Sequence, residues 1–277
     1  MEIELITTGT ELLLGRVLNT HQQWIGQRLA DSGYTLSRQV TVPDTGQAIR
    51  EAVQTALGRA RLVITTGGLG PTSDDITRGL IADLLARPVG RDESIVSHIE
   101  SFFARRNRPI PESVLVQAQV PKGAVVIPNE HGTAPGLAIE VSPNTFHETG
   151  IPAWLLMLPG PPRELRPMVE DRALPFIKKH LSLEQSFHCR TLRSLGIGES
   201  MVEEVLLGQL NPLMDRGLDL GFCARTGQVD IRLSGSGPEI PALIVEAEAT
   251  IRAAIDKQIY GTDDETIEQV VVGRLIA

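Results

Sequence analysis

Apolar and polar residues in the first 90 positions follow two alternating periodicities. Short apolar runs bounded by glycine or proline are typical of strands, whereas apolar residues spaced three and four apart are typical of amphipathic helices. The expected elements are strands at 2–8, 34–42 and 61–66 and helices at 20–32, 45–59 and 72–84. Strands that alternate with helices in this way predict an α/β fold with a doubly wound, mostly parallel sheet.

The pattern between residues 91 and 181 is less regular and contains many prolines. The helical pattern near residues 92–105 breaks at Pro109 and Pro111. The helix expected at 162–180 has proline near its start, and we expect it to be interrupted at Pro175. The expected elements are helices at 92–105 and 162–180 and strands at 124–127, 136–141, 145–148 and 154–158. A hairpin around Ser142-Pro143-Asn144 is expected to join the second and third of these strands.

The pattern changes again after residues 182–186, which we interpret as a hinge. The expected elements are strands at 187–195, 221–224 and 229–234 and helices at 199–210, 240–257 and 265–277. This order predicts a small α+β domain, followed by a helix whose apolar face has no visible partner. We therefore divide the chain into domains at 1–181 and 182–262 and a C-terminal helix at 263–277, which either docks on a second subunit or begins a further domain.

Composition and charge narrow the function classes. The chain of 277 residues is 42% hydrophobic but only 4% aromatic, so its core is aliphatic and it offers few stacking platforms for bases. The formal net charge of −8 disfavours nucleic acid as a partner. No apolar run is long enough to cross a bilayer. Cys189 and Cys223 lack zinc-site spacing, and we expect a cytoplasmic location with reduced thiols.

Three predicted strands end in glycine or a carboxylate, at residues 9–11, 43–44 and 67–75. In open parallel sheets, ligands bind outside the carboxyl ends of the strands. The longest of these segments has glycines at Gly67, Gly68 and Gly70, followed by a helix expected to begin at Thr72 or Ser73. Exposed amides and the helix N-terminus would together form an anion site suited to phosphate.

Carboxylates beside that anion site suggest a metal ion. Asp74 and Asp75 would oppose phosphate binding unless a cation lay between them, although acidic residues in a first helical turn also stabilise a helix by about 0.3–1 kcal/mol each. Asp44 has an alternative role as a helix N-cap, and Glu11 as a solvated carboxylate. Since neighbouring strand ends lie about 5–10 Å apart, Glu11, Asp44 and Asp75 are predicted to share one divalent ion. Oxygen ligands favour magnesium, manganese or calcium.

Two further loops contain glycine and proline. In the first, Gly160 and Pro161 are expected to contact the ligand and Glu164 to reach the metal or a hydroxyl, although a purely rigid turn is the alternative. In the second, Gly132 and Thr133 are candidate ligand contacts. We assign the general base to Asp74 or Glu164, whichever is not a metal ligand. A Gly196-Ile197-Gly198-Glu199 segment has the wrong spacing and charge for a nucleic-acid-binding KH loop.

Four separated motifs resemble the competence/damage-inducible protein CinA family. They are Gly9-Thr10-Glu11-Leu12-Leu13, the segment from Thr66 to Asp75, Gly132-Thr133-Ala134-Pro135-Gly136 and the segment from Leu158 to Glu164. The resemblance implies a molybdopterin-binding fold like that of MogA and MoaB, followed by a KH-like domain. The resemblance does not extend to the C-terminal nicotinamide mononucleotide deamidase domain of many members, so no deamidase activity is assigned.

The resemblance implies metal-dependent hydrolysis of ADP-ribose to AMP and ribose 5-phosphate. Asp44 and Asp75 match ligand-site positions of the molybdopterin-binding fold, and Glu11 and Glu164 match less directly. The chain departs from the family at Glu130-His131. The predicted catalytic residues are Asp44, Asp74, Asp75 and Glu164, and the predicted substrate contacts are Gly9, Thr10, Gly67, Gly68, Gly70, Thr72, Ser73, Gly132, Thr133, Gly160 and Pro161.

The expected partners are a small nucleotide substrate and a second copy of the chain in a homodimer, with neither a membrane nor nucleic acid. The expected cofactor is a divalent cation, with a monovalent cation as a further candidate. Two alternatives remain open. One is binding or transfer of a molybdopterin-type pterin, which rests on the fold alone, and the other is a non-catalytic module in competence or repair.

Overall fold

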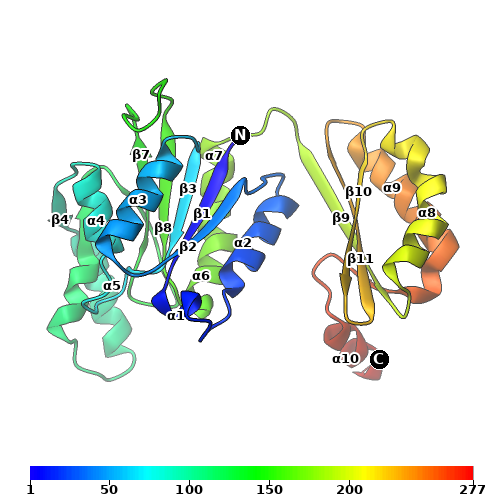
Figure 1. Ribbon diagram of the computed structural model, residues 1–277. Coiled ribbons are helices and arrows are strands. Elements are labelled where there is room, and N and C mark those ends of the chain that lie inside the picture. The colour runs from blue at the N-terminus through cyan, green and yellow to red at the C-terminus, as the bar shows by residue number, and fades with distance from the viewer. Residues whose placement is uncertain (277) are drawn as a thin grey trace. The chain divides into compact units, whose positions relative to one another are not determined.

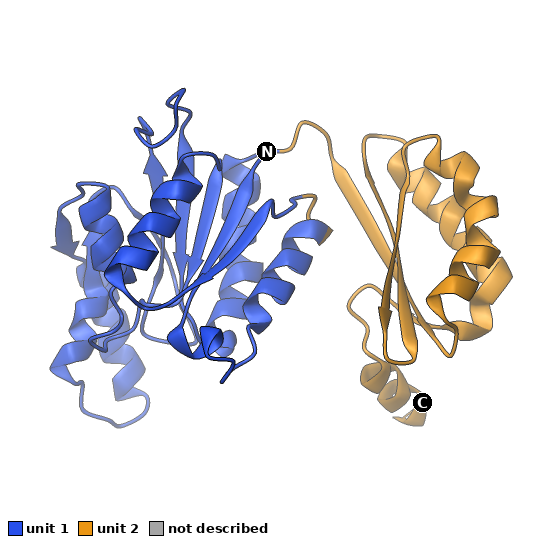
Figure 2. Ribbon diagram, viewed as in Figure 1, with its two compact units in different colours: residues 1–30, 34–182 blue, residues 31–33, 183–277 orange. Residues whose placement is uncertain are grey.

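The computed structural model describes residues 1–276 and divides into two compact units (Figures 1 and 2). Unit 1 contains residues 1–30 and 34–182, and unit 2 contains residues 31–33 and 183–277. The expected C-terminal helix includes Ala277, which lies outside the described residues. Each unit has its own hydrophobic core.

Unit 1 is built on a six-stranded sheet in the order β2-β1-β3-β8-β7-β6. Four strands are parallel, namely β1 (Ile3–Thr8), β2 (Arg38–Val42), β3 (Leu62–Thr66) and β8 (Ala153–Leu158). Next to β8, β7 (Gly136–Val141) runs antiparallel to it and to the edge strand β6 (Val125–Ile127). Every residue of β1 and β3 is buried, including Glu4, whose carboxylate pairs with Arg59, and the threonines at the carboxyl ends of both strands. Burial of all residues of a strand is typical of a parallel sheet covered on both faces. The predicted doubly wound, mostly parallel α/β fold is confirmed.

Helices cover both faces of this sheet. One face is covered by α3 (Gly46–Leu57) and α4 (Thr77–Leu84), whose Ile49, Val53 and Ile81 join the core formed with β1, β3 and β8. Figure 1 shows α2 (Thr20–Asp31), α6 (Pro162–Met168) and α7 (Leu174–His180) on the other face. In the sheet, β2 lies on one side of β1 and β3 lies on the other. The direction in which successive strands are added therefore reverses between β1 and β3. This reversal opens a crevice at the strand ends.

The helix expected to begin at Thr72 or Ser73 begins instead at Thr77, so this prediction was wrong by about one turn. The side chain of Asp75 is the reason, because its Oδ2 accepts hydrogen bonds from the amide of Thr72 (3.0 Å) and from its hydroxyl (2.5 Å). These bonds close a local turn that competes with the helix. Asp74 and Asp75 therefore lie before the helix and not in its first turn.

The strand expected at 145–148 is also absent, and these residues form turns. Asn144 is 1% exposed, and its Nδ2 donates to the carbonyl of Leu57 at 2.8 Å while its Oδ1 accepts from the amide of Phe146 at 3.1 Å. An asparagine that bonds its own backbone two residues on favours a turn over a strand.

The long helix after β8 is interrupted, as predicted, but earlier than Pro175. A π-helical turn at Val169–Ala173 separates α6 from α7. The remaining elements of unit 1 are α1 (Thr10–Leu13), β4 (Val89–Arg91), α5 (Glu93–Ala104), a 3₁₀ helix at Glu112–Ala118 and β5 (Gln119–Pro121). The short α1, the 3₁₀ helix and the β4–β5 pair were not predicted.

Unit 2 is a four-stranded antiparallel sheet in the order β10-β11-β9-β12. Its strands are β9 (Phe187–Leu195), β10 (Asp219–Arg225), β11 (Gln228–Ser236) and β12 (Ile259–Thr262), and its helices are α8 (Glu199–Met214), α9 (Ile240–Ile255) and α10 (Ile267–Ile276), with a 3₁₀ turn at Asp256–Gln258. Leucines and isoleucines of α8 and α9 pack on β9 and β11. The short β12 was not predicted.

Candidate functional site

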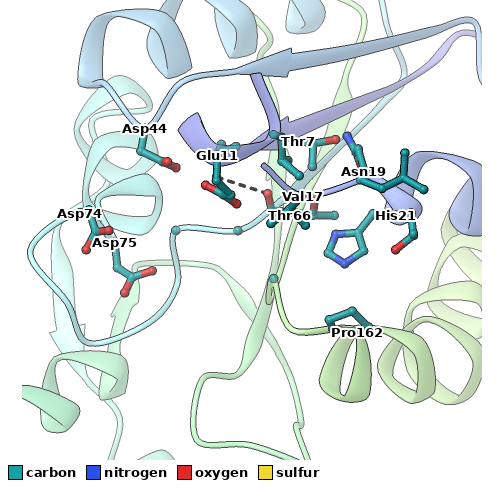
Figure 3. Close-up of a pocket in the computed structure, with 18 residues that line it drawn as sticks. Thr7, Glu11, Val17, Asn19, His21, Asp44, Thr66, Asp74, Asp75 and Pro162 are labelled. Atoms are coloured by element: carbon teal, nitrogen blue, oxygen red, sulfur yellow. Dashed lines mark hydrogen bonds between the residues drawn. The ribbon is translucent and has the colours of Figure 1, made fainter. Parts of the chain in front are cut away.

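A pocket of about 360 Å³ lies at the carboxyl ends of β1, β3 and β8 (Figure 3). Its position is the one that the chain reversal between β1 and β3 provides. It is lined by Thr7, Thr8, Gly9, Glu11, Leu12, Val17, Leu18, Asn19, Thr20, His21, Asp44, Thr66, Gly67, Gly68, Asp74, Asp75, Gly160 and Pro162. Figure 3 shows Asp44, Asp74 and Asp75 at one end and His21 with Pro162 at the other.

The Gly67-Gly68 turn forms one wall of the pocket and requires glycine at both positions. Their φ angles are 100° and 68°. A Cβ on Gly67 would lie 2.6 Å from Oγ1 of Thr8, and a Cβ on Gly68 would lie 2.0 Å from Oγ1 of Thr77. Both the left-handed backbone and the close approach therefore exclude other residues, and the wall is backbone without side chains. Within it, the Gly67 amide donates to the carbonyl of Leu158 and the Gly68 carbonyl accepts from the amide of Thr77, each at 3.1 Å.

Asp44 connects the ends of the first two strands. Its Oδ2 accepts from the amide of Thr10 at 2.8 Å, and its amide donates to Oγ1 of Thr10 at 3.3 Å. The N-cap of α3 is Thr45, so the alternative role of Asp44 as a helix cap is ruled out. The two bonds instead hold α1 and Glu11 beside Asp44 at the mouth of the pocket.

The carboxylates of Asp74 and Asp75 differ in their surroundings. Thr72, whose single hydroxyl proton is donated to Asp75, and the backbone amide of Asp74 hold the pKa of the exposed Asp74 carboxylate below its ordinary value. Behind Asp75 lies Arg78, which is 4% exposed and donates from Nη1 to the carbonyl of Leu69 at 3.3 Å. Burial lowers the pKa of this guanidinium, while the nearby Asp75 opposes that shift. Arg78 thus supports the glycine turn from below.

Glu164 does not line this pocket. It is 7% exposed and lies under the loop at 129–134, where its Oε2 accepts from Nδ2 of Asn129 at 2.8 Å. A Cβ on Gly132 would lie 1.9 Å from the same oxygen, so Gly132 makes room for the carboxylate. With Glu130 and His131 it borders a separate cavity of about 20 Å³. The structure therefore gives Glu164 a local role in holding this loop.

The other predicted site residues fall into two groups. Thr10, Gly70, Thr72, Ser73 and Pro161 are outside the lining but adjoin residues that form it, whereas Gly132 and Thr133 belong to the loop above Glu164. Four of the predicted substrate contacts, Gly9, Gly67, Gly68 and Gly160, line the pocket.

Sequence reasoning missed the opposite end of the pocket. His21 is half-buried, and burial, followed by the positive charge of Arg166, lowers its pKa from the ordinary 6.5. Its neighbours Val17, Leu18 and Asn19 also line the pocket. These three residues could have been identified in the sequence because they lie between the glycine that follows the first strand, Gly9, and the helix α2.

Within residues 1–276, no group of three or more histidine, cysteine, aspartate or glutamate side chains could by itself hold a metal ion. Glu11, Asp44 and Asp75 share the pocket but do not form a ready three-carboxylate cluster. In the same described part of the chain, no helix is long and apolar enough to span a membrane.

Two family descriptions match the chain. Residues 4–179 match the probable molybdopterin binding domain, and residues 189–261 match the KH domain of damage-inducible protein CinA. The chain is 41% identical over 275 residues to a CinA-like protein of Akkermansia muciniphila, which covers 99% of this chain and 63% of that protein. It is 40% identical over 282 residues to a competence-damage inducible protein of Caldicellulosiruptor bescii, with 99% and 64% coverage.

A solved structure shows the same similarity. The crystal structure of the protein CinA from Thermoplasma acidophilum matches with a TM-score of 0.55 and 30% identity, covering 63% of this chain and 98% of that one. The chain spans less than two thirds of the length of the two curated relatives. The matches cover both units, in the order that the sequence motifs predicted. The chain therefore belongs to the probable molybdopterin binding domain family and, with its KH domain, to the CinA proteins.

Proposed function

We propose that unit 1 hydrolyses the diphosphate bond of a nucleoside diphosphate sugar of the ADP-ribose class, with a divalent cation. The observation that carries this proposal is that Glu11, Asp44 and Asp75 line one pocket together with the bare backbone of Gly67, Gly68 and Gly160. Peptide groups without side chains suit a phosphate, and carboxylates beside them suit the cation that must accompany it.

The residues of the pocket fit a cation that is shared with the substrate. Their side-chain donors at this end are oxygens, which magnesium and manganese prefer. Magnesium usually takes only one or two protein carboxylates and completes its coordination with substrate phosphates and water. A bound divalent cation would neutralise the diphosphate and lower the pKa of a coordinated water. Asp75 and Asp44 would hold it, with Glu11 as a third candidate.

The remaining groups of the chain position the substrate. The Gly67 amide already donates to the carbonyl of Leu158 at 3.1 Å, so the amides that would contact one phosphate are those that follow it in the turn. The buried Arg78 keeps that turn in place. Of the two candidates for the general base, Glu164 lies outside the pocket lining and Asp74 lies within it. Asp74, or Glu11 if it is not a metal ligand, would therefore take the proton.

Asp75→Asn tests this proposal. The variant keeps an oxygen that can accept from Thr72 but loses the negative charge, so we expect metal-dependent release of AMP from ADP-ribose to fall by orders of magnitude. The melting temperature should change little because the side chain is at the surface of a turn. Rates would be measured with magnesium, with manganese and with EDTA.

The matched control is Asp83→Asn, which changes an acidic residue within α4 that is outside the pocket. It should keep the full rate. Equal rates for Asp75→Asn and the wild type, or AMP release that persists in EDTA, would contradict the proposal.

A second candidate is binding of a molybdopterin-type pterin, favoured by the family match over residues 4–179. Purified protein would be examined for a bound fluorescent pterin, and pterin and ADP-ribose would be compared as competitors for the same pocket. Pterin binding without ADP-ribose binding would favour this second function. A lack of both would favour the interaction module.

The homodimer and the cytoplasmic location stay predictions. The surface proposed for the dimer is formed by the exposed Val271, Val272, Leu275 and Ile276 of α10.

A further inference from the structure

The pocket has an apolar end that the diphosphate proposal does not use. Val17 is 53% exposed and Leu18 is 82% exposed, and both line the pocket with Leu12 and Pro162. Leu13, the last residue of α1, and Leu14, the first residue of the loop after it, are 53% and 68% exposed but do not line the pocket. Single exposed leucines are common on protein surfaces, whereas several along the rim of a pocket are typical of a ligand-binding site.

Polar groups at this end could fix the orientation of a ring. Figure 3 shows the His21 imidazole and the Asn19 side chain at the end opposite Asp44 and Asp75. The Asn19 amide donates from Nδ2 to Oγ1 of Thr41 at 3.2 Å and accepts at Oδ1 from the amide of Gln22 at 3.4 Å, which leaves one N–H and one lone pair for a ligand. A neutral imidazole also has one donor and one acceptor. Apolar walls with a few hydrogen-bonding groups are what planar heteroaromatic rings require.

Between the two ends, two hydroxyls lack partners. Thr7 and Thr66 face each other in the register of β1 and β3, are each 1% exposed and line the pocket. Their Oγ1 atoms are buried and make no hydrogen bond. An unpaired buried polar group is unfavourable, so a group that enters the pocket and bonds these hydroxyls would relieve that penalty.

We infer that the end formed by Leu12, Val17, Leu18, Asn19, His21 and Pro162 binds the heteroaromatic base of the nucleotide, with Thr7 and Thr66 bonding its sugar. This inference rests on the proposed function, because it assigns the base and sugar subsites of the same substrate. It orients the substrate with its base toward α2 and its diphosphate toward Asp44 and Asp75.

The first test is Leu18→Ser, with Leu14→Ser as the matched control. Both leucines are exposed in the same loop, so neither change should unfold the protein, but only Leu18 lines the pocket. Calorimetry would compare AMP, which has a base, with ribose 5-phosphate, which has none. We expect Leu18→Ser to weaken AMP binding about tenfold, as the loss of one apolar side-chain contact would. Ribose 5-phosphate binding and the Leu14→Ser variant should be unchanged.

The second test is Thr66→Val, which replaces the unpaired hydroxyl with a methyl group of similar size. In the free protein it should leave the melting temperature unchanged or raise it, while AMP and ribose 5-phosphate should bind several-fold more weakly. A lower melting temperature with unchanged binding would show that the hydroxyl has only a structural role, which would overturn the sugar contact.

Failure of this inference is distinguishable from failure of the proposed function. If AMP binds no better than ribose 5-phosphate, or if Leu18→Ser and Leu14→Ser have equal effects, the base subsite is wrong even when ADP-ribose is hydrolysed. If AMP binding depends on Leu18 while no diphosphate is hydrolysed, the subsite stands and the hydrolase proposal is wrong.

Discussion

At the scale of single residues, Gly68 makes the strictest demand on the sequence. We expect Gly68→Ala to destabilise unit 1 by about 1–3 kcal/mol, because alanine is strained at φ 68° and its Cβ would meet Oγ1 of Thr77 at 2.0 Å. Gly79→Ala is the matched control, since Gly79 lies within α4 with nothing within 4 Å of its Cβ position, and alanine favours a helix by about 1 kcal/mol over glycine. Urea unfolding of both variants would measure the difference, and equal stabilities would contradict the account of the turn.

His21 should titrate below its ordinary pKa of 6.5, because burial and Arg166 both disfavour its charged form. The folded state then binds fewer protons than the unfolded state just below pH 6.5, so the stability that depends on this group is present above that pH and is lost as the pH falls. NMR titration should show the lowered midpoint, and Arg166→Gln should move it toward 6.5. Arg163→Gln, on the exposed side of the same helix, should leave it unchanged; a shift of equal size there would remove Arg166 as a cause.

The sequence located some pocket residues better than others for a physical reason. Glu11, Asp44 and Asp75 follow strands directly, so the sheet itself brings them to one edge. Glu164 also follows a strand, but its side chain bonds Asn129 and turns away from the pocket. That choice depends on a hydrogen bond to a residue 35 positions away, which no local pattern encodes. The sequence did not identify Arg78, because the local pattern of a helix does not distinguish a buried arginine from an exposed one.

At the scale of elements, apolar periodicity predicted the long helices and the buried strands, and β9 matches its expected range residue for residue. The errors occur where a polar side chain bonds nearby backbone. Asp75 delays the start of α4, and Asn144 converts the expected strand at 145–148 into a turn. Short elements such as β4 and β12 depend on pairing with distant segments, so their own residues give little signal.

At the scale of the whole molecule, the separate cores of the two units predict two separable unfolding transitions. Leu155 in unit 1 and Leu206 in unit 2 are each 0% exposed and belong to different cores. Leu155→Ala should lower the unfolding temperature of unit 1 only, and Leu206→Ala that of unit 2 only. Each change should lower the free energy of unfolding of its own unit by about 2–5 kcal/mol. Differential scanning calorimetry would resolve them, and one transition that shifts equally in both variants would contradict the prediction.

The reversal of strand order between β1 and β3 has a consequence for how new specificity can arise in this fold. The two connecting helices leave the reversal on opposite faces of the sheet, so a hollow persists there whatever side chains surround it. Residues 13–18 border this hollow and are all exposed, so they can be exchanged without repacking the interior, whereas Gly67, Gly68 and the buried Leu69 must stay. Directed evolution of ligand preference should accordingly concentrate its diversity in residues 13–18 and leave the glycine turn and the strands untouched.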